Sequence, residues 1–193
     1  MTTRVILFQG GGEGAHDEDR LLAESLQKAL GTEYDVRYPR MPEESKPDMQ
    51  TWKTKIAKEL ESLDGRIILV GHSVGGLALL KYLSEEKVEK PIPGLFLLAV
   101  PSRDDENWNF DDLRLPPDLA SKLSRIPQIF LYHNRDDKIV PFSHLALHAA
   151  RLPRAIVREG DNGGHQFGND LGKVASDIRG LSESINKTER TYE

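Results

Sequence analysis

The sequence predicts a single α/β domain in which a six-stranded parallel sheet lies between two layers of helices. Six short apolar segments alternate with longer amphipathic segments along the 193 residues. Several of the apolar segments are continuous, which is typical of strands covered on both faces. The length is that of one ordinary domain. We therefore expect parallel strands joined by right-handed helical crossovers, which gives a three-layer α/β/α sandwich.

The expected strands are short, and the second is the most polar, which predicts an edge position. They lie at Val5–Gln9, Tyr34–Tyr38, Ile67–Val70, Leu95–Val100, Ile129–His133 and Ala155–Arg158. Between them, apolar residues recur every three or four positions, as on one face of a helix. These helical stripes occupy Leu22–Leu30, Trp52–Leu63, Leu77–Leu83, Leu145–Leu147 and Leu171–Ile185. We place one domain at residues 1–185, with an irregular excursion at 101–124 and a polar C-terminal tail at 186–193.

The composition excludes several classes of protein. There is no cysteine, which excludes disulfides, thiolate metal sites and cysteine nucleophiles. The 31 acidic residues outnumber the 26 Lys and Arg, which argues against nucleic acid as a partner because phosphate binding requires a basic surface. The longest apolar run, Leu95–Val100, is far shorter than the ~20 residues of a membrane span, and the N-terminus lacks a signal-peptide pattern. We expect a soluble cytoplasmic protein with no membrane partner.

The strongest local motif is Gly71-His72-Ser73-Val74-Gly75, which matches the pattern G-x-S-x-G. It stands between a predicted strand and a predicted helix, and this is the setting in which the pattern marks a nucleophilic serine. The glycines permit a turn so tight that side chains there would collide with neighbouring elements. Such a turn projects the Ser73 hydroxyl above the sheet at a helix N-terminus, where the helix dipole favours developing negative charge.

A serine hydroxyl requires a base, and the base requires an orienting carboxylate. In this setting the partners follow along the chain in the order Ser, Asp or Glu, His. Asp137 follows the fifth predicted strand, and His165 follows the sixth. Loops at the carboxyl ends of parallel strands meet at one edge of the sheet. The sequence therefore predicts a catalytic triad of Ser73, Asp137 and His165.

Other acids and histidines compete for these roles. Asp136 adjoins Asp137, and we prefer Asp137 for its spacing to Val140-Pro141, so Asp136 is expected to cap a turn or face solvent. His72 is expected to support the turn at the nucleophile without transferring a proton. His133 ends a strand and is interpreted as a core histidine with satisfied hydrogen bonds.

Two patterns could indicate a metal. His144 and His148 share a helix face, but no Glu lies between them, and we expect a solvated face. The acidic stretch around residues 104–112 fails the calcium-loop pattern because Phe110 stands where the loop requires Gly. We expect no metal and no cofactor.

Acyl transfer also requires hydrogen-bond donors for the oxyanion. One expected donor is the backbone N–H of Val74, directly after the nucleophile. The other is expected from the glycine-rich loop Gln9–Gly14, where glycines let the backbone approach a substrate carbonyl. We favour the N–H of Gly11, with Gly12 as the rival donor.

The same loop permits a second interpretation. Gly10, Gly12 and Ala15 satisfy the dinucleotide-binding pattern G-x-G-x-x-A between a strand and a helix. Asp35 would be the ribose-binding acid, but it starts the second strand, whereas that role needs the strand's end. Acidic residues at the start of the helix would also repel a pyrophosphate. These acids are Glu13, Asp17, Glu18 and Asp19.

Four aromatic residues are candidates for the wall of an acyl pocket. Trp108 and Phe110 lie in the excursion at 101–124, and Phe142 and Phe167 follow the triad loops. In this interpretation the excursion is a short flap over the pocket. The alternative is a solvated loop with one or two aromatics packed on the body.

These motifs resemble the α/β-hydrolase superfamily, and more narrowly its small, uncapped serine hydrolases of the retinoblastoma-binding protein nine type. The resemblance covers nearly the whole chain, at Gln9–Gly12, Gly71–Gly75, Asp137–Pro141 and Gly164-His165. It implies the strand order 2-1-3-4-5-6 and a serine hydrolase acting without a cofactor on carboxylic esters, thioesters or small amides. One departure is Gln9-Gly10, where many members carry His-Gly.

The main functional hypothesis is therefore a serine hydrolase that cleaves a small-molecule acyl substrate through an acyl-enzyme on Ser73. An alternative is a binding protein on a hydrolase scaffold with slow or no turnover, because fold and function separate readily. A third hypothesis is the dinucleotide-binding oxidoreductase. The sequence discloses neither the acyl length nor the oligomeric state.

Overall fold

Six parallel strands form one sheet in the order β2-β1-β3-β4-β5-β6. This computed structural model describes residues 3–102 and 114–191. The strands are β1 (Thr3–Phe8), β2 (Tyr34–Arg37), β3 (Ile67–His72), β4 (Gly94–Leu98), β5 (Gln128–Asn134) and β6 (Ile156–Gly160). The predicted fold class and strand order are confirmed, and β2 occupies an edge as its polarity predicts.

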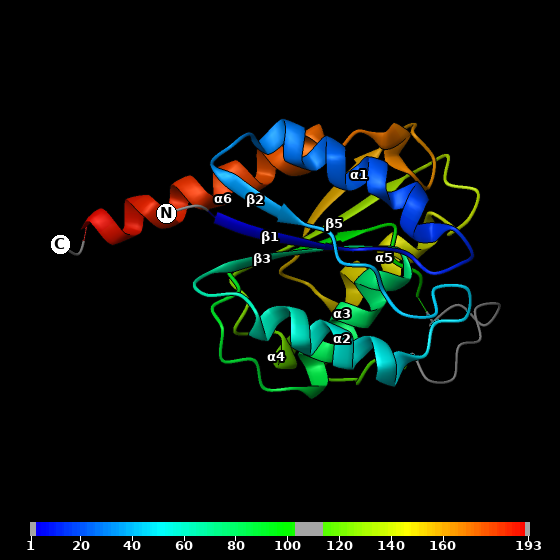
Figure 1. Ribbon diagram of the computed structural model, residues 1–193, viewed down its shortest axis with the longest axis horizontal. Coiled ribbons are helices and arrows are strands. Elements are labelled where there is room, and N and C mark those ends of the chain that lie inside the picture. The colour runs from blue at the N-terminus through cyan, green and yellow to red at the C-terminus, as the bar shows by residue number, and fades with distance from the viewer. Residues whose placement is uncertain (1–2, 103–113, 192–193) are drawn as a thin grey trace.

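Helices cover both faces of the sheet (Figure 1). One face carries α1 (Ala15–Leu30) and α6 (Gly172–Thr191), and the other carries α2 (Met49–Glu61), α3 (Val74–Glu85), α4 (Leu119–Lys122) and α5 (Ser143–Arg151). A 3₁₀ turn, η2 (Phe167–Asn169), precedes α6. The C-terminal part of α6 extends past the edge of the body, so residues 186–191 continue this helix (Figure 1). No helix within the described ranges is long and apolar enough to cross a lipid bilayer.

Successive residues of each strand pack on opposite faces of the sheet. In β1, Val5 and Leu7 contact the apolar cluster beneath α1 and α6, whereas Ile6 and Phe8 contact the cluster beneath α2 and α3. All four side chains are fully buried. A strand with helices on both faces needs apolar residues at every position, which explains the continuous apolar runs in the sequence.

The edge strands are more polar than the interior ones. In β2, Asp35 is exposed beside Arg37, and in β6 the central residues Val157, Arg158 and Glu159 are all exposed. The interior strands β3 and β4 are buried along their whole length. Sequence polarity therefore tracks the position of each strand in the sheet.

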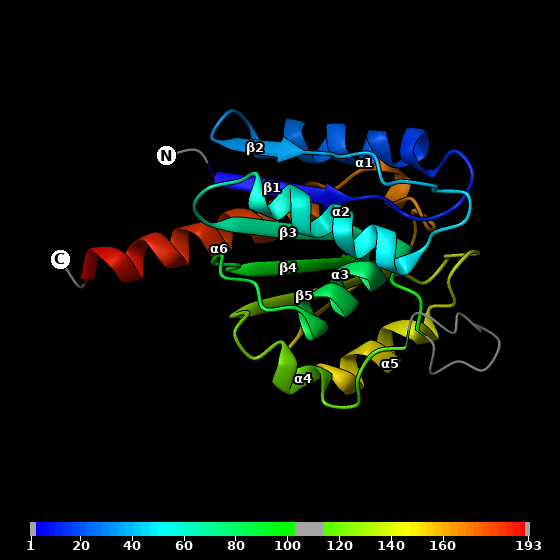
Figure 2. The same cartoon turned by 60° about the horizontal axis from the view of Figure 1, so that its bottom comes forward.

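The parallel arrangement directs four loops to one side of the molecule. The loops that follow β1, β3, β5 and β6 all leave the carboxyl ends of these strands, as can be followed in Figure 2. The registers place the end of β1 beside β3, with Phe8 opposite Gly71, and the end of β5 beside β6, with Asn134 opposite Gly160. These ends carry the glycine-rich loop, Ser73, Asp137 and His165.

Glycines allow α3 to start directly against the strand ends. A Cβ on Gly71 would stand 2.5 Å from the Cα of Gly76, and a Cβ on Gly75 would collide with the carbonyl oxygens of Phe8 and Gln9. At both positions the obstacle is backbone, which cannot rotate away. The tight turn expected from the G-x-S-x-G motif is therefore enforced by the close approach of α3 to β1 and β3.

We predict that Gly75→Ala destabilises the fold because the added methyl group has no free space. Overpacking of this kind costs about 1–3 kcal/mol or more, which lowers Tm by about 3–10 °C for a chain of this length. The matched control is Gly180→Ala in α6, where a Cβ meets nothing within 4 Å and helix propensity favours Ala by about 0.5–1 kcal/mol. Thermal unfolding followed by circular dichroism tests both, and equal Tm values for Gly75→Ala and the wild type would contradict the packing argument.

Candidate active site

Ser73 stands at the junction between β3 and α3 in a strained backbone conformation. Its φ and ψ angles are 50° and −123°, in a region that residues with a Cβ rarely adopt. Its N–H donates to the carbonyl oxygen of Leu98, 2.8 Å away, which holds the turn against β4. Val74 is the first residue of α3, so its N–H has no acceptor within the helix. The turn thus presents a hydroxyl and a backbone donor side by side.

Asp137 and His165 form the hydrogen bond expected of an acid and a base. The Nδ1 of His165 donates to Oδ2 of Asp137 at 2.8 Å. The other carboxylate oxygen accepts the N–H groups of Ile139 and Val140 at 2.8 and 2.9 Å, which fixes its orientation. Because Nδ1 carries the proton in this bond, Nε2 of a neutral His165 is left as the proton acceptor.

His133 is a second histidine on the same carboxylate. Its Nε2 donates to the carbonyl oxygen of Val140 at 3.0 Å and lies 3.2 Å from Oδ2 of Asp137. Both side chains are buried, and His133 is hydrogen-bonded in the core as expected. Burial alone would raise the pKa of Asp137, but the hydrogen bonds from His133 and His165 outweigh it and hold this pKa well below its ordinary value. Asp137 is therefore ionised at neutral pH.

His72, the residue before Ser73, connects the nucleophile turn to the loop that carries His165. The Nε2 of His72 donates to the backbone carbonyl of His165 at 3.0 Å, and the two rings lie 4.7 Å apart. No hydrogen bond between the Ser73 hydroxyl and His165 is found in the part of the chain that the structure describes. Asp137 is thus hydrogen-bonded directly to His165. Ser73 is next in the chain to His72, which binds the loop of His165.

Asp136 holds the loop that carries His165. Its carboxylate accepts the N–H groups of Gly163 and Gly164 at 3.1 and 2.9 Å, and Nδ2 of Asn134 donates to the carbonyl of Gly164 at 2.9 Å. Asp136 therefore caps a turn, one of its two expected roles, and the turn belongs to a segment 27 residues away. The two neighbouring aspartates therefore have different roles: Asp136 binds the backbone of the loop, and Asp137 binds the ring of His165.

In the glycine-rich loop after β1, two of the three N–H groups of Gly10, Gly11 and Gly12 are occupied. The N–H of Gly10 donates to Oδ2 of Asp19 at 2.7 Å, and the N–H of Gly12 donates to the carbonyl of Glu44 at 2.6 Å. Within the described residues, the N–H of Gly11 has no acceptor. A Cβ on Gly11 would stand 3.3 Å from Cγ2 of Val74, so this residue lies over the start of α3.

Gln9 and Glu44 hold this loop in place through hydrogen bonds. Gln9 is fully buried; its Oε1 accepts the N–H of Met41 at 3.0 Å and its Nε2 donates to Glu44 at 2.6 Å. The same Glu44 oxygen accepts the N–H of His16 in the first turn of α1 at 2.9 Å. A side-chain carboxylate thus occupies the helix N-terminus that a dinucleotide would need for its pyrophosphate. These contacts give the departure at Gln9-Gly10 a structural role.

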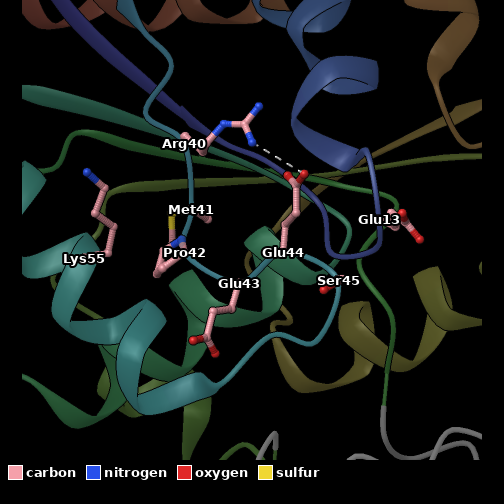
Figure 3. A pocket seen from close by; sticks show the side chains of 8 residues that line it. All are labelled: Glu13, Arg40, Met41, Pro42, Glu43, Glu44, Ser45 and Lys55. Atoms are coloured by element: carbon pink, nitrogen blue, oxygen red, sulfur yellow. Dashed lines mark ion pairs between the residues drawn. The ribbon is translucent and has the colours of Figure 1, made fainter.

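A groove opens beside the glycine-rich loop (Figure 3). It measures about 780 Å³, and Glu44 lies in its wall, 3.8 Å from Arg40 in an ion pair. The other lining residues are Glu13, Met41, Pro42, Glu43, Ser45 and Lys55. Because Glu44 belongs both to the groove and to the support of Gln9, the groove wall and the glycine-rich loop form one hydrogen-bonded unit.

The four aromatic candidates for the pocket wall do not lie together as far as they can be placed. Phe142 packs on the α2 and α3 face, with its ring edge-on to His133 at 5.8 Å. Phe167 packs on the α1 and α6 face. Trp108 and Phe110 lie outside the described residues. Phe142 and Phe167 therefore pack against apolar clusters on opposite faces of the sheet, and the Phe167 ring lies 6.3 Å from that of His72.

The expectation of a solvated face at His144 and His148 is wrong. Both side chains are buried, because they bind the backbone where the chain leaves β4. The N–H of Ser102 donates to Nδ1 of His144 at 2.9 Å, and Nε2 of His148 donates to the carbonyl of Pro101 at 3.1 Å. Across residues 3–102 and 114–191, no group of three or more metal-ligating side chains is assembled.

Sequence reasoning missed the supporting residues. Asp19 and Glu44 carry no local motif, and their partners lie far away in the sequence. Asp19 drew attention only as one of several acids that would repel a phosphate. His133 and Asp137 lie at the end of a strand and in the turn that follows it, where their spacing of four residues does not indicate a contact.

Comparisons with known proteins give the family of the chain and agree with its fold. A family model described as Serine hydrolase matches residues 18–173. The ydeN gene product from B. subtilis is similar in structure, with a TM-score of 0.74 and 20% identity over 94% of this chain and 100% of that chain. A serine hydrolase involved in carbazole degradation, the CarC enzyme, has a TM-score of 0.69 and 16% identity over 94% and 91% of the two chains.

Est1E from Butyrivibrio proteoclasticus is also similar, with a TM-score of 0.66 and 16% identity over 96% of this chain and 88% of that chain. A search of curated proteins finds no match. At such low identity the structural similarities establish the fold and leave the substrate open.

The lowered pKa values at the site predict an acid-sensitive fold. Burial opposes ionisation of Asp19, but His72 and the donors around it outweigh burial, so the pKa of Asp19, like that of Asp137, lies below the ordinary 3.8. A carboxyl whose pKa is lower in the folded chain stabilises the fold above its unfolded-state pKa, and this contribution is lost as pH falls through the folded-state value.

We therefore expect Asp137→Asn to lower Tm most at neutral pH and progressively less below about pH 4. There the Asp137 carboxyl of the unfolded wild type takes up a proton while the folded chain still keeps it ionised, so its stabilising contribution shrinks as pH falls toward the folded-state pKa. Asp17→Asn, at a side chain that is 74% exposed, is the control and should leave Tm nearly unchanged throughout. Differential scanning calorimetry between pH 2 and pH 8 measures these differences. A Tm difference for Asp137→Asn that does not vary with pH would show that the charge of Asp137 does not stabilise the fold.

Proposed function

The chain belongs to the serine hydrolase family, and from the geometry of the site we propose that it hydrolyses carboxylic esters through an acyl-enzyme on Ser73. The fold that it shares with known hydrolases supports an assignment to the α/β-hydrolase superfamily. The narrower likeness to the retinoblastoma-binding protein nine type stays a prediction. One observation carries the proposal: a buried, ionised Asp137 orients His165 on the loop that meets the turn of Ser73.

In the proposed mechanism, Oγ of Ser73 attacks the substrate carbonyl carbon while Nε2 of His165 takes the hydroxyl proton. Asp137 stabilises the resulting imidazolium. The carbonyl π electrons move to oxygen, and the oxyanion accepts hydrogen bonds from the N–H groups of Val74 and Gly11. Collapse of this intermediate expels the alcohol, which takes the proton from His165. Water then attacks the acyl-enzyme by the same steps and releases the acid.

The assignment of Gly11 is supported by its neighbours. The N–H groups of Gly10 and Gly12 both donate to acceptors within the protein, which leaves the N–H of Gly11 for a ligand. A Cβ on Gly11 would stand 3.4 Å from the Cβ of Val74, so the two residues that carry the proposed donors are neighbours. A pair of backbone donors aimed at one point is the arrangement that acyl transfer requires.

We predict that Ser73→Ala loses activity on short p-nitrophenyl esters by about 10⁴-fold or more, because no other group supplies the attacking oxygen. The variant should also fail to react with a fluorophosphonate probe, and its Tm should stay near that of the wild type. Ser62→Ala, at an exposed serine directly after α2, is the control and should behave like the wild type. Initial rates, probe labelling and thermal unfolding measure these outcomes.

Two results would contradict the proposal. Full activity in Ser73→Ala would place the nucleophile elsewhere. A wild-type protein that neither turns over esters nor reacts with the probe would favour the alternative of a binding protein on a hydrolase scaffold.

A further inference from the structure

A second Asp–His pair, Asp19 and His72, lies next to the proposed triad and contacts the backbone of His165. Asp19 of α1 and His72 of the nucleophile turn are each only 1% exposed, and Oδ2 of Asp19 lies 2.7 Å from Nδ1 of His72. The two residues are 53 positions apart in the sequence. Neither transfers a proton in the mechanism above, yet burying two ionisable groups is costly unless each is fully paired.

The hydrogen-bond partners determine the charge of this pair. Asp19 accepts from the N–H of Gly10 at 2.7 Å and from Nε2 of Gln166 at 3.0 Å, in addition to His72. A carboxyl with three donors around it is an ionised carboxylate. Nε2 of His72 faces the carbonyl of His165 and so carries a proton. Because Nδ1 faces the carboxylate, it carries a proton too, and His72 is an imidazolium.

The pKa directions agree with these partners. Burial opposes the charged form of His72, but the Asp19 carboxylate outweighs burial and raises the pKa of His72 above its ordinary 6.5. The pKa of Asp19 is lowered, as described for the site. Both groups are therefore charged at neutral pH, and the pair is a buried salt bridge.

This salt bridge contacts three of the segments that the proposed chemistry requires, namely the glycine-rich loop, the nucleophile turn and the base loop. Asp19 holds the glycine-rich loop through the N–H of Gly10, one residue before the proposed oxyanion donor. It holds the base loop through Gln166, directly after His165. His72 precedes the nucleophile in the chain and binds the backbone of the base. One buried ion pair thus fixes three separate loops relative to one another.

We propose that Asp19 and His72 are positioning residues that set the distance between the oxyanion donor, the nucleophile and the base. This inference rests on the proposed function. Displacing a donor or a base by about 1 Å costs up to about 10²-fold in rate. Loss of the pair should therefore reduce kcat by about 10–100-fold and change KM little, because the affected contacts strengthen only in the transition state.

The test is a double-mutant cycle of Asp19→Asn, His72→Gln and the double variant, with Asp17→Asn as the control on the same helix. We measure kcat and KM for p-nitrophenyl acetate well below each Tm, with active enzyme counted by fluorophosphonate titration. Each single variant should lose kcat by a similar factor. The double variant should lose no more than the larger single loss, because the two residues act as one unit.

Several outcomes overturn the inference. Variants with lowered Tm but wild-type kcat would make the pair structural only, and losses that multiply in the double variant would show two independent roles. Loss of activity in the Asp17→Asn control would show that any charge change on α1 suffices. An inactive and unreactive wild type would contradict the proposed function instead.

A measurement on the unmodified protein keeps the inference testable if the variants do not fold. The ring ¹⁵N chemical shifts of His72 in wild-type protein at pH 7.5, read by NMR, report whether both nitrogens carry protons. We expect the imidazolium pattern. A neutral tautomer would remove the salt bridge and with it the proposed positioning role.

Discussion

The structure depends on one steric constraint, the approach of α3 to the carboxyl ends of β1 and β3 at backbone contact. Gly71 and Gly75 are the positions where this approach leaves no room for a side chain. The strained φ of Ser73 is a consequence, because the chain must reverse within a few residues between a buried strand and a buried helix. The cost of this strain is met by the packing around it, in which α3 is buried along most of its length. The position of Ser73 is thus fixed by the packing of α3 in the core.

The loops around the nucleophile show a second regularity. They are rich in glycine, which gives them little side-chain packing and a high entropic cost of ordering. Carboxylates anchored on other elements compensate by accepting their backbone N–H groups, a charge-assisted bond stronger than a neutral one. These carboxylates belong to Asp19, which accepts the N–H of Gly10, and to Asp136, which accepts the N–H groups of Gly163 and Gly164. Some of the acidic residues that exceed Lys and Arg in the composition therefore hold the loops of the site through hydrogen bonds.

The fold and the reactive residues could be predicted from sequence because their signals are local. Strand polarity located β2 at an edge, and the glycine spacing marked Ser73. The supports could not be predicted, because Asp19 and Glu44 acquire their roles from contacts made only after the chain folds. His144 and His148 show the same limit, since their helix spacing suggests a solvated face and their burial follows from polar backbone at Pro101 and Ser102. Local patterns specify elements, and long-range hydrogen bonds specify how the loops are held.

The charges on the edge strands have a consequence for the behaviour of many copies of the chain together. An edge strand exposes unpaired N–H and C=O groups that can pair with an edge of another molecule and extend the sheet between chains. Here β6 presents Arg158 and Glu159, and β2 presents Asp35 and Arg37. Bringing two such edges together would remove water from these partly exposed charged side chains, which is costly. Both edges therefore resist intermolecular strand pairing, which protects a sheet of buried apolar strands from aggregation at high concentration.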